Sequence, residues 1–165
     1  MIIMGIDPGL ATMGFGIINA ERGNFEVVDY GVVTTPKECT LPERLFQIEE
    51  DLTSLIDRYK PENISIEELF FSKNITTGIA VAEARGVILL TAVKKVAGEV
   101  YEYTPNQIKQ ALTGFGGADK RQMQLMVQAV LRLKSIPRPD DAADALAVAL
   151  CHGQTSRLSR EFKVK

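Results

Sequence analysis

The alternation of apolar and polar residues along the chain predicts five strands. Three apolar runs, at residues 1–7, 13–20 and 25–35, are separated by short turn-forming stretches and therefore indicate an antiparallel meander. The segments NISIEEL (63–69) and EVYEYT (99–104) have the composition of two further strands. Because a helix precedes NISIEEL, we expect this fourth strand to run parallel to an earlier one, with the fifth strand parallel to the fourth.

Helical periodicity fills the spaces between and after these strands. Leucine, isoleucine and tyrosine recur at helical spacing from about residue 40 to Pro61, and Thr40 with Glu43 forms a capping-box pattern. Further helices are predicted over residues 75–97, with an interruption near Gly86, and over 105–112, 119–133 and 140–153. This order predicts an α/β fold with one mixed sheet, in which strands 1–3 are antiparallel, strands 4 and 5 are parallel, and helices cover both faces.

Length and composition are those of an ordinary globular protein. The 165 residues are 45% hydrophobic and 24% charged, which suffices for one core without disulfides or a structural metal. We expect a single domain over residues 1–155 and a frayed polar tail over 156–165. The two cysteines are far apart, the start of the chain lacks a secretory pattern, and the apolar runs are too short for a bilayer. A cytoplasmic protein without a membrane segment is therefore expected.

Charge is unevenly distributed, although the net charge is only −2. Residues 1–84 carry a net charge of −8, residues 85–138 carry +6, and the remainder is neutral. A basic segment can bind a polyanion even in a slightly acidic protein, because the field near a surface depends on where charges gather. The same segment is equally compatible with a solvated basic helix.

A few acidic residues interrupt otherwise apolar patterns and so differ from the other carboxylates. Asp7 ends the first strand, the pair Glu67-Glu68 ends the fourth, and Asp141 and Asp144 open the last helix. If the first and fourth strands are parallel neighbours, Asp7 and Glu67 lie together at their carboxyl ends, where open α/β sheets place their sites. Asp141 and Asp144 are three residues apart and therefore share one face of the helix.

Each of these acids also has a structural explanation. Asp7 precedes a Pro-Gly pair and suits an Asx turn, whereas acids in the first turn of a helix interact favourably with its dipole. Asp140 follows a proline and is the expected N-cap of the last helix. Strand parity does not choose between Glu67 and Glu68, because they point to opposite faces and both faces are covered. The argument for a site therefore depends on several acids converging.

An acid cluster of this kind predicts a metal-dependent reaction. Carboxylates in one cleft repel one another unless a divalent cation neutralises them. Because no histidine or cysteine is among the candidates, the favoured ion is hard, Mg²⁺ or Mn²⁺. Such sites suit two-metal chemistry, in which ions about 4 Å apart activate a water molecule and stabilise the leaving oxygen of a phosphodiester. The predicted reaction is phosphodiester hydrolysis.

Five sequence blocks carry a resemblance to a known family. They are GIDPG (5–9), GFG (14–16), SIEELFFSKN (65–74), EARG (83–86) and DAADALAVA (141–149). Together, and in this order, they resemble the RuvC family of bacterial Holliday junction resolvases. The resemblance implies a ribonuclease-H-like fold and a homodimeric, Mg²⁺-dependent endonuclease that nicks opposed strands of a four-way DNA junction and leaves 5′-phosphates. It also implies two ions per active site and a partnership with the RuvA-RuvB branch-migration complex.

Matching positions assign catalytic roles by resemblance. The family's metal-binding catalytic acids correspond to Asp7, Glu67, Asp141 and Asp144. The family block selects Glu67 over its neighbour because the acid directly follows the isoleucine of the strand. Asp140 is an extra acid, so a shift of one residue between Asp140 and Asp141 stays open.

The resemblance also implies contacts with DNA. The predicted contact residues are Phe70, Lys73, Arg85, Lys109, Lys120 and Arg121. Phe70 corresponds to the aromatic residue that wedges among bases at the crossover, whereas Phe71 is expected in the core. Lys109 and Lys120 match lysines near the scissile phosphate, and the other basic residues are expected at more distant phosphates. Taken singly, each basic residue is also compatible with a solvated surface charge.

Two arguments favour a dimer. One chain offers one acid cluster, whereas a two-fold junction requires two matched cuts, which a C₂ dimer supplies. The predicted helix 75–97 is rich in small residues and resembles the family's dimerisation surface, although its pattern equally fits a helix buried within one domain.

Other functions share parts of this pattern. Actin-like ATPases also begin with a strand, an aspartate and a glycine turn, but they need a second domain and another phosphate loop, for which 165 residues leave no room. A junction-binding module without catalysis would have the same fold, but all four acids are present here. His152, near the end of an apolar helix, is interpreted as a packing residue without a catalytic role.

Overall fold

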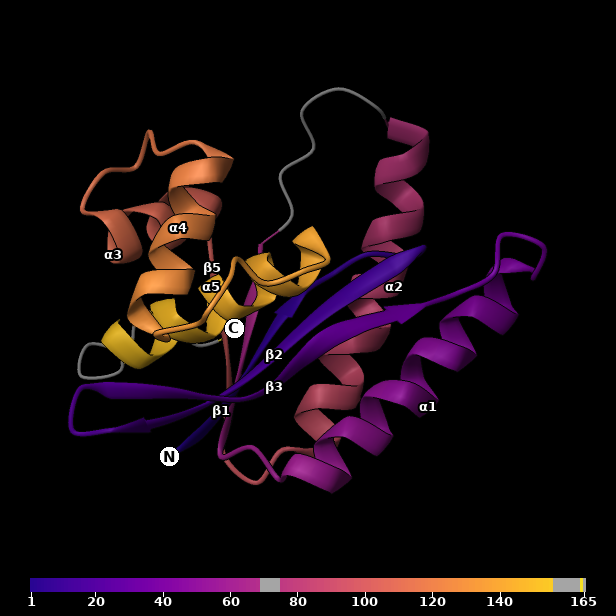
Figure 1. The fold of residues 1–165 in the computed structure, drawn as a ribbon. Coiled ribbons are helices and arrows are strands. Elements are labelled where there is room, and N and C mark those ends of the chain that lie inside the picture. Colours follow the sequence, from indigo (N-terminus) through magenta and orange to yellow (C-terminus); the bar gives the residue numbers. More distant parts are fainter. Residues whose placement is uncertain (69–74, 156–163, 165) are drawn as a thin grey trace.

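The computed structural model describes residues 1–68, 75–155 and 164, and its elements follow the predicted order. The strands are β1 (Ile2–Asp7), β2 (Thr12–Glu21), β3 (Asn24–Thr34), β4 (Asn63–Glu67) and β5 (Glu99–Tyr103). The helices are α1 (Leu41–Tyr59), α2 (Ile75–Lys95), α3 (Pro105–Thr113), α4 (Lys120–Val130) and α5 (Asp140–Thr155). The predicted fold class, α/β with one mixed sheet, is confirmed (Figure 1).

The five strands lie in the order β3-β2-β1-β4-β5. β1, β2 and β3 pair antiparallel through short turns, whereas β4 runs parallel to β1 and β5 runs parallel to β4. Ile6 of β1 lies beside Ile66 of β4, so the residues that follow them, Asp7 and Glu67, end neighbouring strands at one edge of the sheet. The topology therefore brings Asp7 and Glu67 together at the carboxyl ends of two neighbouring strands.

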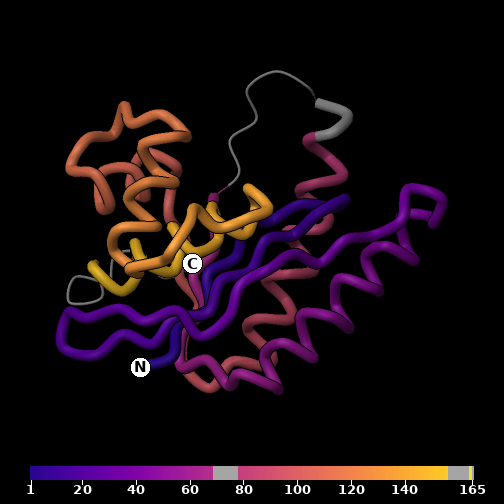
Figure 2. Tube along the Cα trace, in the orientation of Figure 1, coloured from indigo at the N-terminus to yellow at the C-terminus, as the bar shows by residue number. Residues whose placement is uncertain are grey.

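Helices cover both faces of the sheet, and each face has its own apolar core. α1 and α2 pack against each other on one face, over residues such as Met4 and Ile64. On the other face α5 lies directly on β1 and β2, and α3 and α4 pack against α5. The chain trace shows α5, in yellow, crossing the sheet on the side of α3 and α4 (Figure 2). This layering confirms the prediction of helices on both faces.

Glycines on the two central strands allow α5 to lie directly on the sheet. A Cβ atom on Gly5 would come 2.1 Å from the carbonyl oxygen of Ala145, and one on Gly16 would come 2.8 Å from the backbone nitrogen of Leu146. Any side chain at these positions would push the helix away. The sequence blocks GIDPG and GFG therefore set the position of the helix that carries Asp141 and Asp144.

Three local predictions are wrong. α2 is continuous through Gly86, because one glycine costs a helix only about 1 kcal/mol, which packing against α1 can offset. α4 ends at Val130 instead of residue 133, and Arg132 adopts a left-handed conformation with φ of 52°. Asp140 is the first residue of α5 and not its N-cap, since the carbonyl oxygen of Pro139 already accepts a helical hydrogen bond from the N–H of Ala143.

Some predicted features lie outside the described residues. Phe70, Phe71 and Lys73 are among them, as is most of the predicted C-terminal tail. Val164, which the structure describes, donates its backbone N–H to the carbonyl oxygen of Val100 at 3.2 Å and packs against the core beneath α1 and α2. In the part of the chain that is described, none of the helices is long and apolar enough to cross a membrane.

His152 is fully buried, which agrees with its interpretation as a packing residue. The amide nitrogen of Asn63 donates to Nε2 of His152 at 3.2 Å. The ring proton therefore lies on Nδ1, 2.8 Å from the hydroxyl oxygen of Tyr103. Burial lowers the pKa of His152 to about 4, so the ring is neutral in the folded protein near pH 7.

We expect His152 to weaken the fold at acidic pH. Between pH 6.5 and about pH 4 the unfolded chain binds a proton that the folded chain does not, so the free energy of unfolding falls with falling pH, by at most about 3 kcal/mol. Urea unfolding at several pH values, compared with a His152→Gln variant, isolates this contribution because the carboxylates titrate alike in both proteins. An equally steep decline in the variant would contradict the expectation.

Candidate active site

The structure brings Asp7, Glu67, Asp141 and Asp144 to one edge of the sheet. Asp7 and Glu67 are the last residues of β1 and β4. Asp7 pairs with Gly14 of β2, and a Cβ atom on Gly14 would lie 2.1 Å from the carbonyl oxygen of Asp141. The first turn of α5 therefore lies against the strand that pairs with Asp7. Asp144, one turn later, acts electrostatically on both strand acids.

Geometry distinguishes Glu67 from Glu68, which strand parity alone leaves open. Glu67 lies beside Tyr103 of β5, whose side chain packs in the core on the side of α3 and α5. Glu67 accordingly lines a cleft together with Lys109, Lys120 and Asp144. Glu68 follows the strand, and its backbone N–H donates to the carbonyl oxygen of Tyr103 at 2.9 Å. The acid that faces the other carboxylates is therefore Glu67.

The cluster carries negative charge that its surroundings do not fully compensate. Burial, followed by the charges of Glu67, Asp144 and Asp141, raises the pKa of Asp7 to about 8. Burial and the charge of Asp144 raise the pKa of Glu67 to about 7, although Lys109 and Lys120 oppose the shift. Burial also raises the pKa of Asp144. Full ionisation of this cluster is therefore unfavourable without an additional cation.

Lys120 links the cluster to Asp140. Its ammonium nitrogen lies 3.1 Å from Oδ2 of Asp144 and 3.4 Å from Oδ2 of Asp140. Partial burial alone would lower the pKa of Lys120, but the two carboxylates raise it above its ordinary value. Asp140 also accepts hydrogen bonds from Gln124, at 3.1 Å, and from Arg138. Asp140 therefore contacts Lys120, whereas the charge that acts on Asp7 from the first turn of α5 is that of Asp141.

Gln124 and Arg138 were not among the residues expected at the site. Gln124 is buried and lies four residues after Lys120 on α4, so both side chains reach Asp140 from the same face of that helix. The spacing is visible in the sequence. A glutamine within an amphipathic helix nevertheless carries no sign of burial, so the sequence offers little reason to single it out.

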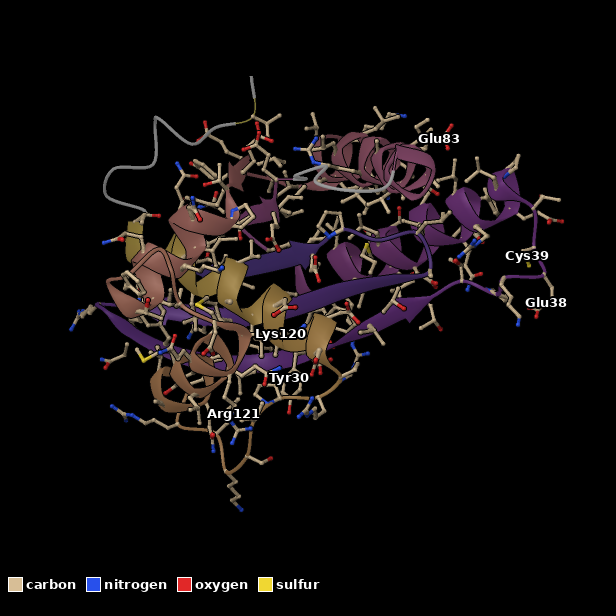
Figure 3. The ribbon with its side chains drawn as sticks, turned by 90° about the horizontal axis from the view of Figure 1, so that it is seen from above. Tyr30, Glu38, Cys39, Glu83, Lys120 and Arg121 are labelled. Atoms are coloured by element: carbon tan, nitrogen blue, oxygen red, sulfur yellow. The ribbon has the colours of Figure 1, made fainter. Side chains whose placement is uncertain are left out.

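The predicted basic residues take different positions. Lys109 of α3 and Lys120 of α4 line the cleft beside the acids. Arg121 is exposed, and Figure 3 shows it further from α5 than Lys120 is. Arg85 of α2 forms an ion pair with Glu102, a residue of β5 that points away from the acid cluster. The structure therefore brings the two lysines, but not Arg85, to the acids.

The cleft beside the acids is small. It has a volume of about 200 Å³. Besides the charged residues, its lining includes four apolar residues: Pro105, Ile108, Met123 and Ala147. A larger groove, of about 1000 Å³, lies between the β2–β3 turn and the end of α4. The residues that line that groove include none of the predicted site residues. A search for the site by cavity size alone would therefore select this groove and miss the acid cluster.

The donor set fits a hard divalent cation. All four clustered acids offer carboxylate oxygens, which Mg²⁺ and Mn²⁺ prefer. Burial and, after it, the neighbouring carboxylates raise the pKa values of Asp7 and Glu67, and a bound cation would offset both effects. Within the described ranges, no three Asp, Glu, His or Cys side chains lie close enough together to hold one ion as they stand. Binding would therefore require the acidic side chains to turn toward one another, with Asp144 exchanging its contact with Lys120.

Known proteins resemble this chain in sequence and fold. The family described as "Crossover junction endodeoxyribonuclease RuvC" matches residues 3–152. A protein of that name from Alkaliphilus oremlandii is 51% identical over 165 residues, which cover all of both chains. The solved structure of T. thermophilus RuvC in complex with a Holliday junction substrate has a TM-score of 0.89 at 33% identity, over 99% of this chain and 100% of that one. The yeast mitochondrial Holliday junction resolvase Ydc2 shares the fold, with a TM-score of 0.66 at 12% identity, over 92% of this chain and 78% of that one.

The sheet order and the positions of the acids define a class of protein. A mixed sheet of this order, with carboxylates at the ends of two central strands and on the helix that covers them, is the architecture of a ribonuclease-H-like nuclease. Sequence similarity over nearly the whole length narrows that class. The chain belongs to the RuvC family of crossover junction endodeoxyribonucleases.

Proposed function

We propose that this protein resolves four-way DNA junctions by paired, metal-dependent hydrolysis of phosphodiesters in opposed strands, during recombination and repair in the cytoplasm. The observation that carries the proposal is the convergence of Asp7, Glu67, Asp141 and Asp144 beside two lysines. It is supported by the 51% identical relative, which is named a crossover junction endodeoxyribonuclease, and by the similar structure that holds a Holliday junction.

The four acids would hold two Mg²⁺ ions, with Mn²⁺ as a substitute. Bound there, the ions would supply an activated water molecule and positive charge for the departing 3′ oxygen, so that the nick carries a 5′-phosphate. Asp7 and Glu67 are fixed by hydrogen-bonded strands, which restricts their backbone and leaves only side-chain rotation to complete the site. Asp141 and Asp144 are placed by the close contact of α5 with the glycines of β1 and β2.

The two lysines of the cleft position the scissile phosphate. Lys120 lies 3.1 Å from Asp144, and Lys109 acts electrostatically on Glu67, so a phosphate held by both ammonium groups lies next to the acids. Such contacts place the DNA without reading its sequence. Arg121 and Lys73 are proposed to contact more distant phosphates, and Phe70 to wedge among bases at the crossover. Arg85 would have to exchange Glu102 for a phosphate.

The outer face of α2 supports a homodimer. Ile79, Leu90 and Val93 are each more than half exposed, and their spacing of eleven and three residues puts them on one face of the helix. Glu83, on the same face, points away from the sheet (Figure 3). An apolar stripe of this kind suits a second copy of the chain, whose acid cluster would make the opposed cut. We propose that the dimer receives junctions from the RuvA-RuvB complex.

Cleavage of a synthetic junction tests the proposal. With Mg²⁺, we expect symmetric nicks in two opposed strands, ligatable by virtue of their 5′-phosphates, and no nicking in EDTA. Linear duplex of the same sequence should bind at least about 10³-fold more weakly and stay intact. Equal nicking of duplex, or nicking in EDTA, would contradict the proposal. Tight junction binding without nicking would instead support the non-catalytic module of the same fold.

A further inference from the structure

The loop between α3 and α4 displays a large aromatic side chain to solvent. Phe115 is 64% exposed, although its residue type is more often buried. Exposed large apolar residues elsewhere in the described chain include Phe46 of α1 and the apolar stripe of α2, which consists of Ile79, Leu90 and Val93. Phe115 is separate from that stripe, because it lies in the glycine-rich segment that connects two helices of the other face.

Several hydrogen bonds hold this loop in one shape. The hydroxyl oxygen of Thr113 accepts the backbone N–H of Phe115 at 3.1 Å, and the side-chain amide of Gln110 donates to the carbonyl oxygen of Gly114 at 2.8 Å. The carbonyl oxygen of Phe115 accepts the N–H of Ala118 at 3.2 Å. The exposure of the aromatic ring is therefore a property of an ordered loop, and little conformational entropy would be lost on binding.

The ring lies against the backbone of Gly117. A Cβ atom on Gly117 would come 2.5 Å from Cζ of Phe115, so only glycine lets the ring take this position. The far end of the ring therefore lies against the loop, while most of the side chain stays accessible. A flat aromatic surface fixed in this way is the arrangement on which nucleobases stack.

Basic residues precede and follow Phe115 along the chain. Lys109 lies before the loop on α3, and Lys120 and Arg121 follow it on α4. Lys120 is five positions after Phe115, and this stretch of chain spans at most about 18 Å. At about 3.4 Å per nucleotide along a strand, the ring lies within about five nucleotides of a phosphate held by Lys120. The DNA proposed to occupy the cleft would therefore pass within reach of Phe115.

A protein partner fits this surface less well. Within the described chain, the exposed large apolar residues at this loop are Phe115 and Leu125, which line a shallow groove together with Met126. Two such side chains are few for a stable interface, which buries about 800 Å² on each partner. A single exposed ring is sufficient for a base, because stacking uses one face of one ring.

We propose that Phe115 stacks on a nucleobase of the bound junction, close to the cleaved strand. The inference rests on the proposed junction-binding function and adds a contact outside the acid cluster. Replacing Phe115 by alanine should weaken junction binding by roughly 5- to 150-fold, the range measured for single base–aromatic contacts. Phe46→Ala, which removes an equally exposed ring from α1 on the other face of the sheet, serves as the matched control.

The absence of tryptophan from the sequence permits a direct measurement. A Phe115→Trp variant contains one tryptophan, whose fluorescence we expect to be quenched on titration with a synthetic four-way junction in Ca²⁺ or EDTA, whereas Phe46→Trp should respond weakly. Gly117→Ala should weaken binding with Phe115 present, because the added methyl group displaces the ring from its support.

Two results would overturn the inference. One is unchanged junction affinity in both Phe115→Ala and Gly117→Ala, with each variant folded as judged by its thermal unfolding. The other is fluorescence of Phe115→Trp that does not respond to saturating junction. Failure of the wild-type protein to bind junctions at all would refute the proposed function itself, so the two failures are distinguishable.

Discussion

An Asp7→Asn variant should lose junction cleavage by about 10³-fold or more while it still binds junctions. A metal ion supplies several kcal/mol to phosphodiester hydrolysis, and about 4 kcal/mol corresponds to a factor of 10³ in rate. Asp7 ends the central strand and is acted on by the three other acids, so its amide analogue removes the charge at the middle of the cluster. Single-turnover cleavage with Mg²⁺ and equilibrium binding in Ca²⁺ separate the two effects.

The same substitution should make the protein more stable. Burial and three nearby carboxylates raise the pKa of Asp7 to about 8, which means that its charge is unfavourable in the folded state. Removing that charge should raise the free energy of unfolding in EDTA by about 1 kcal/mol or more. Asp57→Asn, at an exposed residue that pairs with Lys95, should change neither cleavage nor stability appreciably. Retention of wild-type cleavage by Asp7→Asn would exclude Asp7 as a metal ligand.

The sequence pattern predicted the architecture because each element has a local cause. Alternating apolar runs and short turns specify β1, β2 and β3, and the helical crossover before β4 forces a parallel pairing. The boundaries of α2 and α4 were less accurate. Gly86 left α2 intact, and α4 ended at Val130 where the chain turns through Arg132, because packing and backbone conformation decide these ends.

The sequence pattern singled out the acids as a group, and the family resemblance chose Glu67 and Asp141 within the two acidic pairs. Parity places Glu67 and Glu68 on opposite faces, the family block selects Glu67, and the register with Tyr103 shows the face on which Glu67 lies. Asp140 and Asp141 are adjacent in the sequence, and the contacts of Asp140 with Lys120 and Gln124 distinguish them. Such contacts join helices that are remote along the chain, so no local pattern encodes them.

The positions of the basic residues could not be predicted from the sequence pattern alone. Lys109, Lys120 and Arg85 are alike in the sequence, each a positive charge within the basic segment. The structure places the lysines in the cleft, whereas Arg85 pairs with Glu102 on the opposite face of the sheet. Net charge over a segment predicts a polyanion-binding surface, but it does not say on which face of the sheet each charge lies.

A Gly5→Ala variant should be strongly impaired in both stability and cleavage, although Gly5 touches neither metal ligand nor DNA in the proposed mechanism. The new Cβ atom would lie 2.1 Å from the carbonyl oxygen of Ala145 and 2.5 Å from the backbone nitrogen of Ala149. Both contacts are with the backbone of α5, which cannot move aside as a side chain can. Separation to at least 3.0 Å requires α5 to move by about 1 Å relative to β1.

That movement should have two measurable consequences. Overpacking of a buried interface costs about 1–3 kcal/mol and sometimes more, so we expect a loss of about 3 kcal/mol in the free energy of unfolding. α5 also carries Asp141 and Asp144, and a displacement of about 1 Å at a catalytic group can reduce the rate by about 10²-fold. Urea unfolding and single-turnover cleavage measure the two effects separately.

Gly116→Ala provides the matched control for Gly5→Ala. A Cβ atom on Gly116 would meet no atom closer than 3.9 Å, and its φ angle is not in the left-handed region, so the same substitution should leave stability unchanged or raise it by up to about 1 kcal/mol. Stability equal to wild type in Gly5→Ala would show that α5 can shift without cost. In that case the glycines of β1 and β2 would not be what places Asp141 and Asp144 beside Asp7.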